Sequence, residues 1–158
     1  MPLVEIALLA QEIAAKRRLL GLDVGKRTIG LALSDLTLTV ATASETLMRT
    51  RLASDLAEIA DRVNSLEIGG FVVGLPVSMD GQEGPRCQSV RQFASDLLAR
   101  VDLPLAFWDE RLSTAAVERM LIAEADLSRR RRRQVVDRAA AAYILQGALD
   151  AIAMAKKR

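Results

Sequence analysis

Hydrophobic and polar residues alternate along the first third of the chain in the pattern of short strands. The stretch from Leu19 to Asp35, LLGLDVGKRTIGLALSD, contains two apolar runs that flank a turn at Gly25. A third alternating run, with Thr and Val among its residues, covers Val40 to Met48. A period of two is typical of strands, and a short polar connection between two such runs is typical of a hairpin. The sequence therefore predicts three antiparallel strands at the start of the fold.

Later in the chain, apolar residues spaced three and four apart predict helices that alternate with two buried strands. The helices are Leu52 to Leu66, Val90 to Val101, Val117 to Leu121 with Ser113 or Thr114 as N-cap, and about Gln134 to Met154. The strands are Ile68 to Leu75 and Leu103 to Trp108. Three antiparallel strands continued by two parallel strands through helical crossovers make an RNase H-like fold. This is an α/β fold with a mixed five-stranded sheet flanked by helices.

The length and composition favour one domain with a substantial core. The chain has 158 residues, of which 51% are apolar, so we expect a single domain over residues 1–158. Helical spacing from Pro2 to Lys16 predicts an accessory N-terminal helix within residues 1–17. The longest uncharged stretch, Ile68 to Met79, is too short to span a membrane, and the N-terminus lacks the features of a secretory signal. We therefore expect a cytoplasmic protein.

The absence of histidine restricts the chemistry that the chain can perform. There is no His and only one cysteine, Cys87. This composition excludes Ser-His-Asp triads, Cys-His pairs and the usual zinc sites. Any metal site must consist of oxygen ligands, which suit Mg²⁺ or Mn²⁺. Carboxylates must then carry the chemistry of any active site.

Three acids on separate elements are the candidate metal ligands and catalytic residues. Asp23 ends the first strand, Glu110 follows the last strand, and Asp137 lies in the first turn of the predicted final helix. Two divalent ions held by such carboxylates can clamp a phosphodiester and activate water without histidine. Other interpretations remain: Asp23 could be an ordinary turn residue, and Asp137 an acid near a helix N-terminus. An actin-like ATPase also opens on an Asp-x-Gly turn, but it needs a much longer chain.

The charges are distributed unevenly, which indicates a polyanionic partner. Residues 1–126 contain 13 Lys or Arg against 18 Asp or Glu, whereas residues 127–158 contain 9 against 2. We interpret Leu127 to Arg133 as a basic linker whose arginines contact phosphates; a solvated linker is the alternative. We also interpret Pro76 to Arg86 as a loop over the site. The basic residues expected to contact nucleic acid are Lys26, Arg27, Arg86, Arg111, Arg129, Arg130, Arg131, Arg132 and Arg133.

Four blocks of the sequence resemble the YqgF/RuvX family, whose members are described as pre-16S rRNA nucleases or Holliday junction resolvases. The blocks are LLGLDVGKRTIGLALSD, FVVGLPVSMDGQEGPRCQSVRQFASDL, LPLAFWDERLSTAAVERML and DLSRRRRRQVVDRAAAAYILQGALD. The resemblance implies that Asp23, Glu110 and Asp137 form the family's acidic site, with Asp109 and Arg111 completing its Asp-Glu-Arg-Leu-Ser-Thr signature. It also implies a role in maturing the 5′ end of small-subunit rRNA. The order of basic residues after Asp23 departs slightly from the family pattern.

The aromatic residues favour structured RNA as the substrate over unpaired bases. The chain contains Phe71, Phe93, Phe107, Trp108 and Tyr143, all in predicted strands or helices with apolar neighbours. We expect them in the core, which leaves no platform for stacking bases. Two alternatives remain. One is a resolvase of four-way DNA junctions, which needs a homodimer with the N-terminal helix as a candidate interface. The other is a ribosome-assembly factor that binds RNA without cutting it.

Overall fold

The computed structural model describes residues 3–112 and 129–156, and it describes only the backbone of residues 129–138. In chain order the elements are α1 (Ile6–Glu12), β1 (Arg18–Val24), β2 (Thr28–Ser34), β3 (Ala41–Met48), α2 (Leu52–Ser65), β4 (Ile68–Leu75), α3 (Pro85–Arg100), β5 (Leu105–Asp109) and α5 (Arg129–Lys156). The predicted helix Val117 to Leu121, with its N-cap at Ser113 or Thr114, falls outside the described residues.

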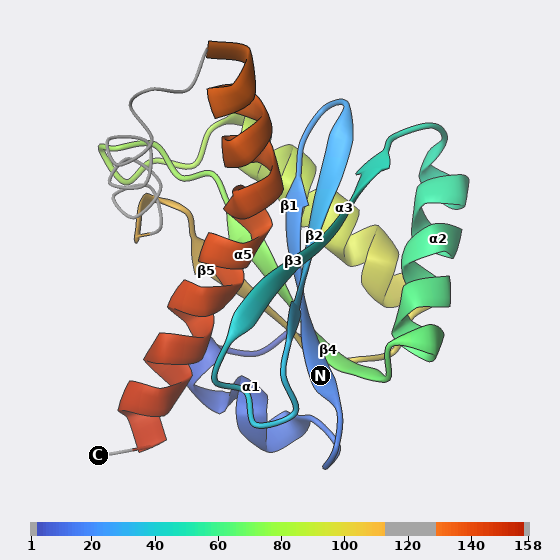
Figure 1. Ribbon diagram of the computed structural model, residues 1–158, viewed down its shortest axis with the longest axis vertical. Helices are drawn as coiled ribbons and strands as arrows, with labels where there is room; N and C mark the ends of the chain where they lie inside the picture. Colours follow the sequence, from blue (N-terminus) through green and yellow to red (C-terminus); the bar gives the residue numbers. More distant parts are fainter. Residues whose placement is uncertain (1–2, 113–128, 157–158) are drawn as a thin grey trace.

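The strands form one sheet in the order β3-β2-β1-β4-β5. Strands β1, β2 and β3 pair antiparallel, and β4 and β5 continue the sheet with parallel pairing (Figure 1). The turn between β1 and β2 is closed by a hydrogen bond of 2.9 Å from the Gly25 amide to the Thr28 carbonyl. This topology confirms the predicted RNase H-like arrangement, including the bounds of β4.

Each face of the sheet covers its own hydrophobic core, because successive side chains of a strand point to opposite faces. On one face, α2 and α3 bury residues that include Leu20, Leu22 and Phe71. On the other face, α5 and Leu9 of α1 pack against Leu19 and the small residues of the central strands. Figure 1 shows α5 running along the sheet, with its first turn at the end where the β1–β2 turn lies. The face covered by α5 is the one that matters for the candidate site.

The N-terminal helix is shorter than predicted and is tied to the sheet. It begins at Ile6, not at Pro2, because Val4 donates a backbone hydrogen bond of 2.9 Å to Leu105 of β5. It ends before Ile13, whose backbone is extended. Leu9 is fully buried in the core under α5. The segment thus extends the sheet beyond β5 before it becomes helical.

Two predicted connections are wrong at their C-terminal ends. The loop after β4 ends at Gly84, not at Arg86, because Pro85 is the first residue of α3, where its fixed φ is favourable. The basic linker is incorrect as well, since Arg129 to Arg133 form the first turns of α5. Arginine has a high helix propensity, and no Gly or Pro separates this run from Gln134.

None of the described helices is long and apolar enough to cross a membrane.

Candidate active site

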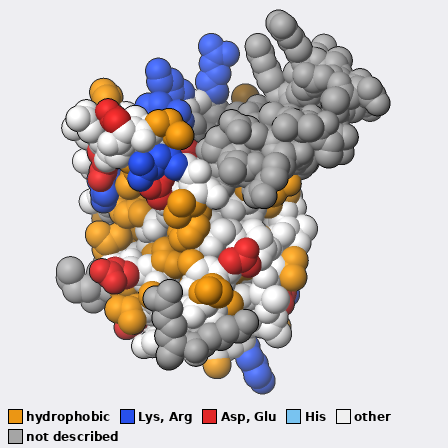
Figure 2. Space-filling model, turned by 90° about the vertical axis from the view of Figure 1, so that its left-hand side faces the viewer, with side chains coloured by type: hydrophobic (Ala, Val, Ile, Leu, Met, Phe, Trp, Pro, Cys, Tyr) orange, Lys and Arg blue, Asp and Glu red, His pale blue; other side chains and the backbone are white. Residues whose placement is uncertain are grey.

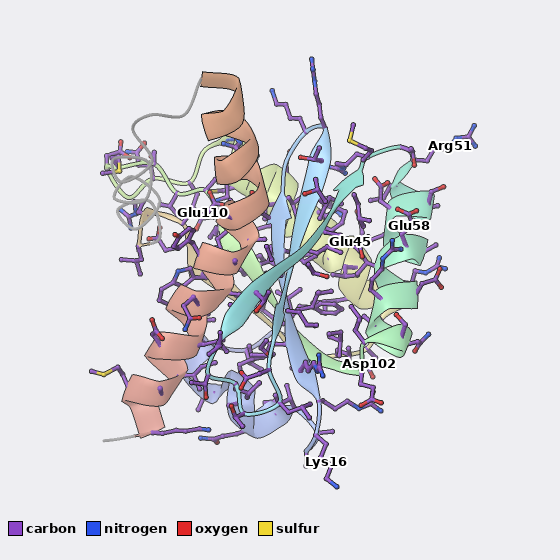
Figure 3. The ribbon with its side chains drawn as sticks, viewed as in Figure 1. Lys16, Glu45, Arg51, Glu58, Asp102 and Glu110 are labelled. Atoms are coloured by element: carbon purple, nitrogen blue, oxygen red, sulfur yellow. The ribbon has the colours of Figure 1, made fainter. Side chains whose placement is uncertain are left out.

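The carboxyl groups of Asp23 and Glu110 meet on the α5 face of the sheet. Asp23 is the penultimate residue of β1, and its side chain points to the same face as Leu19 and Gly21. Glu110 directly follows β5, and its backbone amide donates a hydrogen bond of 3.1 Å to Leu75 of β4. The Glu110 side chain lies beside α5 (Figure 3) and is hydrogen bonded to the Asp23 carboxylate. The structure therefore brings together two of the three predicted acids.

Gly74 makes this meeting possible, and the sequence analysis did not identify it. The parallel register pairs Leu22 with Val73, so Asp23 and Gly74 are the next neighbours along β1 and β4. A Cβ atom at Gly74 would lie 2.8 Å from Oε1 of Glu110 and 2.5 Å from Cδ1 of Ile144. Glu110 can thus lie across β4 toward Asp23 only because residue 74 has no side chain. A glycine inside an apolar strand is the signal that could have indicated such a close approach.

If the carboxylates form the nuclease site that the sequence predicts, replacing Gly74 by Ala should reduce nucleic acid cleavage by about 10-fold to 100-fold, the loss expected when a residue next to a metal ligand is displaced. The added methyl group would push Glu110 away from Asp23, and overpacking against Ile144 should cost about 1 to 3 kcal/mol of stability. Cleavage rate and urea denaturation measure the two effects. Gly84→Ala is the matched control, because a Cβ at Gly84 has nothing within 4 Å. Unchanged cleavage in the Gly74 variant would contradict the assigned role.

The proximity of the two acids changes the ionisation of Glu110. Its pKa is raised from 4.5 to about 7, first by burial and then by the negative charge of Asp23. The protonated Glu110 carboxyl also donates a hydrogen bond to Asp23, which raises the pKa further, whereas the positive charge of Arg86 lowers it. Two adjacent carboxylates repel each other unless a proton or a cation lies between them. The pair is therefore suited to binding a cation.

Asp137 lies on the helix that covers this pair, but the structure does not test its side chain. It is more than two turns after the start of α5, so the prediction that it occupies the first turn is wrong. A Cβ at Gly21 would be 3.2 Å from the Ala141 carbonyl, and Asp137 is one helical turn before Ala141. α5 starts at the end of the sheet where the β1–β2 turn lies (Figure 1). Asp137 precedes Ala141 and Asp23 follows Gly21, so both acids lie toward that end from the contact between Gly21 and Ala141.

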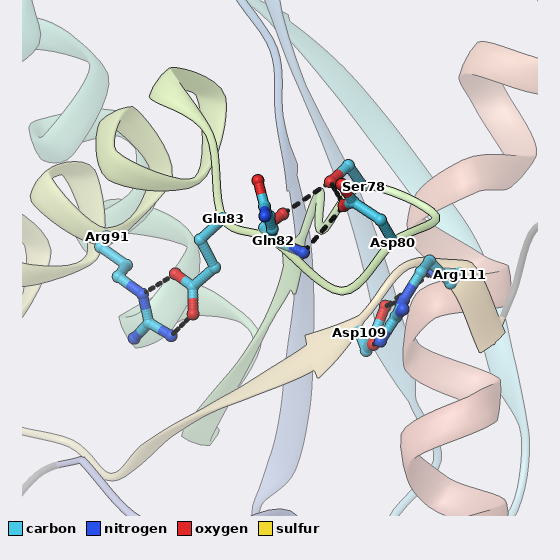
Figure 4. A network of polar contacts seen from close by, with 7 residues as sticks. All are labelled: Ser78, Asp80, Gln82, Glu83, Arg91, Asp109 and Arg111. Carbon is cyan, nitrogen blue, oxygen red and sulfur yellow. Dashed lines mark hydrogen bonds and ion pairs between the residues drawn. The ribbon is translucent and has the colours of Figure 1, made fainter.

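The signature residues Asp109 and Arg111 form an ion pair beside the loop that follows β4. Arg111 donates to both carboxylate oxygens of Asp109, with a shortest distance of 2.6 Å, and this contact lowers the pKa of Asp109. Figure 4 shows the pair facing the loop that carries Ser78 and Asp80. The loop is held by hydrogen bonds from Ser78 to the Gln82 carbonyl at 2.8 Å and by the Glu83–Arg91 ion pair at 2.6 Å. The pair thus lies next to Glu110 in the chain and faces this loop.

The other predicted basic contacts gather at the same end of the molecule. Lys26 and Arg27 are exposed in the β1–β2 turn, and Arg86 is exposed in the first turn of α3. Figure 2 shows most of the Lys and Arg side chains of one face projecting from its upper end. The backbone of Arg129 to Arg133 starts α5 at this end, and their side chains lie outside the described residues (Figure 1). No group of three or more potential metal-binding side chains occurs among the residues described.

The prediction that all five aromatic residues lie in the core is only partly correct. Phe71 and Phe93 are buried in the α2–α3 core. Phe107 is half-buried against the core under α2 and α3, and Trp108 is half-buried against the core under α5. The guanidinium carbon of Arg91 lies 4.8 Å from the centroid of the Phe107 ring. Tyr143 is half-buried and belongs to neither cluster. Phe107 and Trp108 belong to β5, an edge strand of the sheet, which accounts for their partial exposure, whereas Tyr143 belongs to α5.

Comparisons with known proteins agree with this arrangement. A protein of Rhodospirillum rubrum named "Putative pre-16S rRNA nuclease" is 55% identical over 152 residues, covering 96% of this chain and 94% of that protein. A protein of Paramagnetospirillum magneticum with the same name is 55% identical over 150 residues, covering 95% and 96%. These relatives therefore match almost the whole chain.

Solved structures show the same fold at low sequence identity. RuvC of T. thermophilus, in complex with a Holliday junction substrate, superposes with a TM-score of 0.60 at 15% identity, covering 85% of this chain and 94% of RuvC. The yeast mitochondrial Holliday junction resolvase Ydc2 has a TM-score of 0.54 at 10% identity, covering 96% and 86%. The RuvX family model, described as Holliday junction resolvase, matches residues 17–151. The chain therefore belongs to the RuvX family.

Proposed function

We propose that this protein is a nuclease that hydrolyses phosphodiester bonds with the help of Mg²⁺ or Mn²⁺. The observation that carries the proposal is the contact between Asp23 in β1 and Glu110 directly after β5, two partly buried carboxyl groups. Such a pair is costly without a cation, and the family to which the chain belongs is one of nucleases. We propose Asp137 as the third carboxylate, because its helical turn approaches the level of Asp23.

The donor set fits a hard divalent cation. Both described donors are carboxylate oxygens, and the chain has no histidine to favour zinc. A bound divalent cation would neutralise charge that develops on the scissile phosphate and lower the pKa of a water molecule. Asp23 and Glu110 would position the cation, and Gly74 keeps the space for Glu110 open. Asp109 orients Arg111 beside the site, where a positive charge can attract the substrate.

We propose precursor 16S rRNA as the substrate, processed at its 5′ end in the cytoplasm. The support is the identity of 55% to relatives that carry the corresponding name, over nearly the full length of both chains. Cutting of four-way DNA junctions is the second candidate, supported by the description of the RuvX family. A homodimer belongs to that candidate, since paired cuts need two active sites.

The experiment that separates these functions uses two substrates. The purified protein is given a 5′-extended small-subunit rRNA precursor and, separately, a four-way DNA junction, each with Mn²⁺ and with the Asp23→Asn variant as control. We expect metal-dependent cutting of the RNA precursor. Symmetric cutting of the junction with intact RNA would favour the resolvase. Binding of the RNA without any cleavage would instead indicate an assembly factor.

The arginines at the start of α5 provide a separate prediction about binding. Five cations at a helix N-terminus are unfavourable for the helix dipole, so an anionic partner should stabilise this turn. Replacing Arg130 and Arg132 by Gln should reduce the slope of log affinity against log salt concentration by about 0.7 to 0.9 for each lost phosphate contact. Fluorescence anisotropy with the RNA precursor at several salt concentrations measures the slope. An unchanged slope would indicate solvated side chains.

A further inference from the structure

A small cavity with three basic residues lies at the end of the sheet on the side covered by α3. Its volume is about 80 Å³, and its polar lining comes from Gly25, Lys26, Arg49, Arg86 and Ser89. A space of this order holds a few water molecules or one phosphate group, and it is too small for a nucleoside. None of the described residues that line the cavity is a carboxylate. Its surplus of positive charge therefore favours a small anion or an anionic group of a larger ligand.

Arg49 is held in place before any ligand arrives. Its Nη1 donates a hydrogen bond of 2.9 Å to the Gly25 carbonyl, and its Nε is 3.4 Å from Oδ2 of Asp55. The guanidinium carbon lies 5.3 Å from the centroid of the Phe93 ring. Asp55 is only 2% exposed and also accepts a hydrogen bond of 3.0 Å from the Thr50 amide. A guanidinium fixed in this way loses little conformational entropy on binding and keeps further N–H donors for a ligand.

Lys26 and Arg86 complete the cavity from two other elements. Lys26 belongs to the β1–β2 turn, and Arg86 and Ser89 belong to the first turns of α3. Over the part of the chain that is described, neither Lys26 nor Arg86 has an acidic side chain within ion-pair distance. Three separate segments thus bring positive charge to one point, and among the described residues Arg49 alone of the three forms an ion pair.

The cavity is adjacent to the candidate active site but lies across the sheet from it. Gly25 is two residues after Asp23, a distance of about 7 Å along an extended chain. The side chain of Asp23 points toward α5, whereas that of Val24 points into the α2–α3 core. Arg86 is near enough to Glu110 for its charge to influence that carboxyl group. Two neighbouring phosphates of a nucleic acid strand are separated by a distance comparable to that between Asp23 and Gly25.

We propose that this cavity binds a backbone phosphate next to the one that is cut, with Lys26, Arg49 and Arg86 as its ligands. The inference rests on the proposed nuclease function and extends it to the path of the substrate. The nucleic acid strand would pass over the end of the sheet, from the carboxylates under α5 to the cavity beside α3. Asp55 is a positioning residue, because it acts on the phosphate through Arg49. The distance between the two sites then sets which bond is cut relative to the bound phosphate.

The first experiment tests the cavity without any nucleic acid or cleavage. Inorganic phosphate is titrated into the wild-type protein, and backbone amide resonances of Gly25 and Ser89 are followed by NMR. We expect a saturable shift that is lost in Lys26→Gln and in Arg49→Gln. Lys26 is exposed, so its variant should fold normally even if Arg49→Gln is destabilised by the unpaired Asp55. The matched control is Arg51→Gln, because Arg51 is exposed and points away from the molecule (Figure 3). An equal response in all variants would overturn the proposal.

The second experiment locates the bound phosphate in the substrate. RNA and DNA oligonucleotides with one uncharged methylphosphonate linkage at successive positions are bound to the Asp23→Asn variant, which is not expected to cut them. One position adjacent to the cleavage point should weaken binding about 10-fold, the discrimination expected for loss of a charged contact. Adding Lys26→Gln should remove that position's effect, and adding Arg51→Gln should not.

The outcomes distinguish this inference from the nuclease proposal. If the wild type cleaves the substrate but no internal methylphosphonate linkage weakens binding, the proposed role of the cavity is overturned and the nuclease function stays intact. If one internal methylphosphonate linkage weakens binding but the wild type does not cleave the substrate, the result supports phosphate binding in the cavity and contradicts the nuclease function. Binding that depends only on a 5′-terminal phosphate, compared with a 5′-hydroxyl oligonucleotide, would overturn the assignment to an internal phosphate.

Discussion

Replacing Asp23 by Asn should lower the rate of metal-dependent cleavage by more than about 100-fold, the upper limit for residues that only support a metal ligand. The substitution keeps the shape of the side chain but removes the charge that attracts a cation. It also removes the repulsion between Asp23 and Glu110, so the Asn variant should fold at least as stably as the wild type when metal is absent. Single-turnover cleavage with Mn²⁺ and thermal unfolding in EDTA measure the two effects.

Asp102→Asn is the matched control for that experiment. Asp102 is exposed and lies at the opposite end of the sheet from Glu110 (Figure 3). The control variant should cleave like the wild type, because it loses the same charge without touching the site. Full activity of the Asp23 variant would show that its carboxylate is not a metal ligand and would remove the basis of the proposed mechanism.

The metal-free protein should lose stability as the pH rises from about 4.5 to above 7. The pKa of Glu110 is about 7 in the folded protein and near its ordinary value of 4.5 in the unfolded chain. Between these values the folded state binds more protons than the unfolded state, so the free energy of unfolding falls with rising pH. The loss should be about 2 kcal/mol after allowance for solvent screening. Urea denaturation in EDTA at several pH values between 5 and 8 measures it.

Two comparisons make the pH experiment specific to Glu110. Glu110→Gln should remove this part of the pH dependence, because the amide does not titrate. Mg²⁺ or Mn²⁺ should restore stability above pH 7, where the ionised pair can bind a cation. The acids whose pKa is lowered, such as Asp109, act in the opposite direction and only in more acidic solution. Parallel pH profiles for the wild type and the Gln variant would contradict the contact between Asp23 and Glu110.

The sequence predicted the sheet well because its signals are local. The apolar run of β4 between charged or turn residues marked both of its ends correctly. The approach of Asp23 and Glu110 also followed from their positions at the ends of strands. The start of α5 was predicted wrongly for a local reason as well: the run of charges was interpreted as a basic linker, although arginine is a good helix former.

Gly74 and Arg49 were missed because their roles depend on contacts across the fold. Nothing next to Gly74 in the sequence shows that Glu110 must cross over it. Arg49 acquires its role from Gly25, which is 24 residues away, and from the buried Asp55. Patterns of hydrophobicity predict which face of a strand is buried, but not which single side chain must be absent from it or which cation is fixed by a buried acid.

The packing of α5 also has a consequence for synthesis of the protein on the ribosome. Strands β1 to β5 are complete by Asp109, but the apolar face that contains Leu19 and Val72 is covered by a helix that extends to Lys156. During translation the part of this face that α5 covers therefore stays exposed until this helix has left the exit tunnel. The nascent chain at that stage exposes an apolar surface that a chaperone can bind. The helix that closes this surface also carries Asp137, so a chain that stops before α5 lacks both the cover of this core and the third proposed carboxylate.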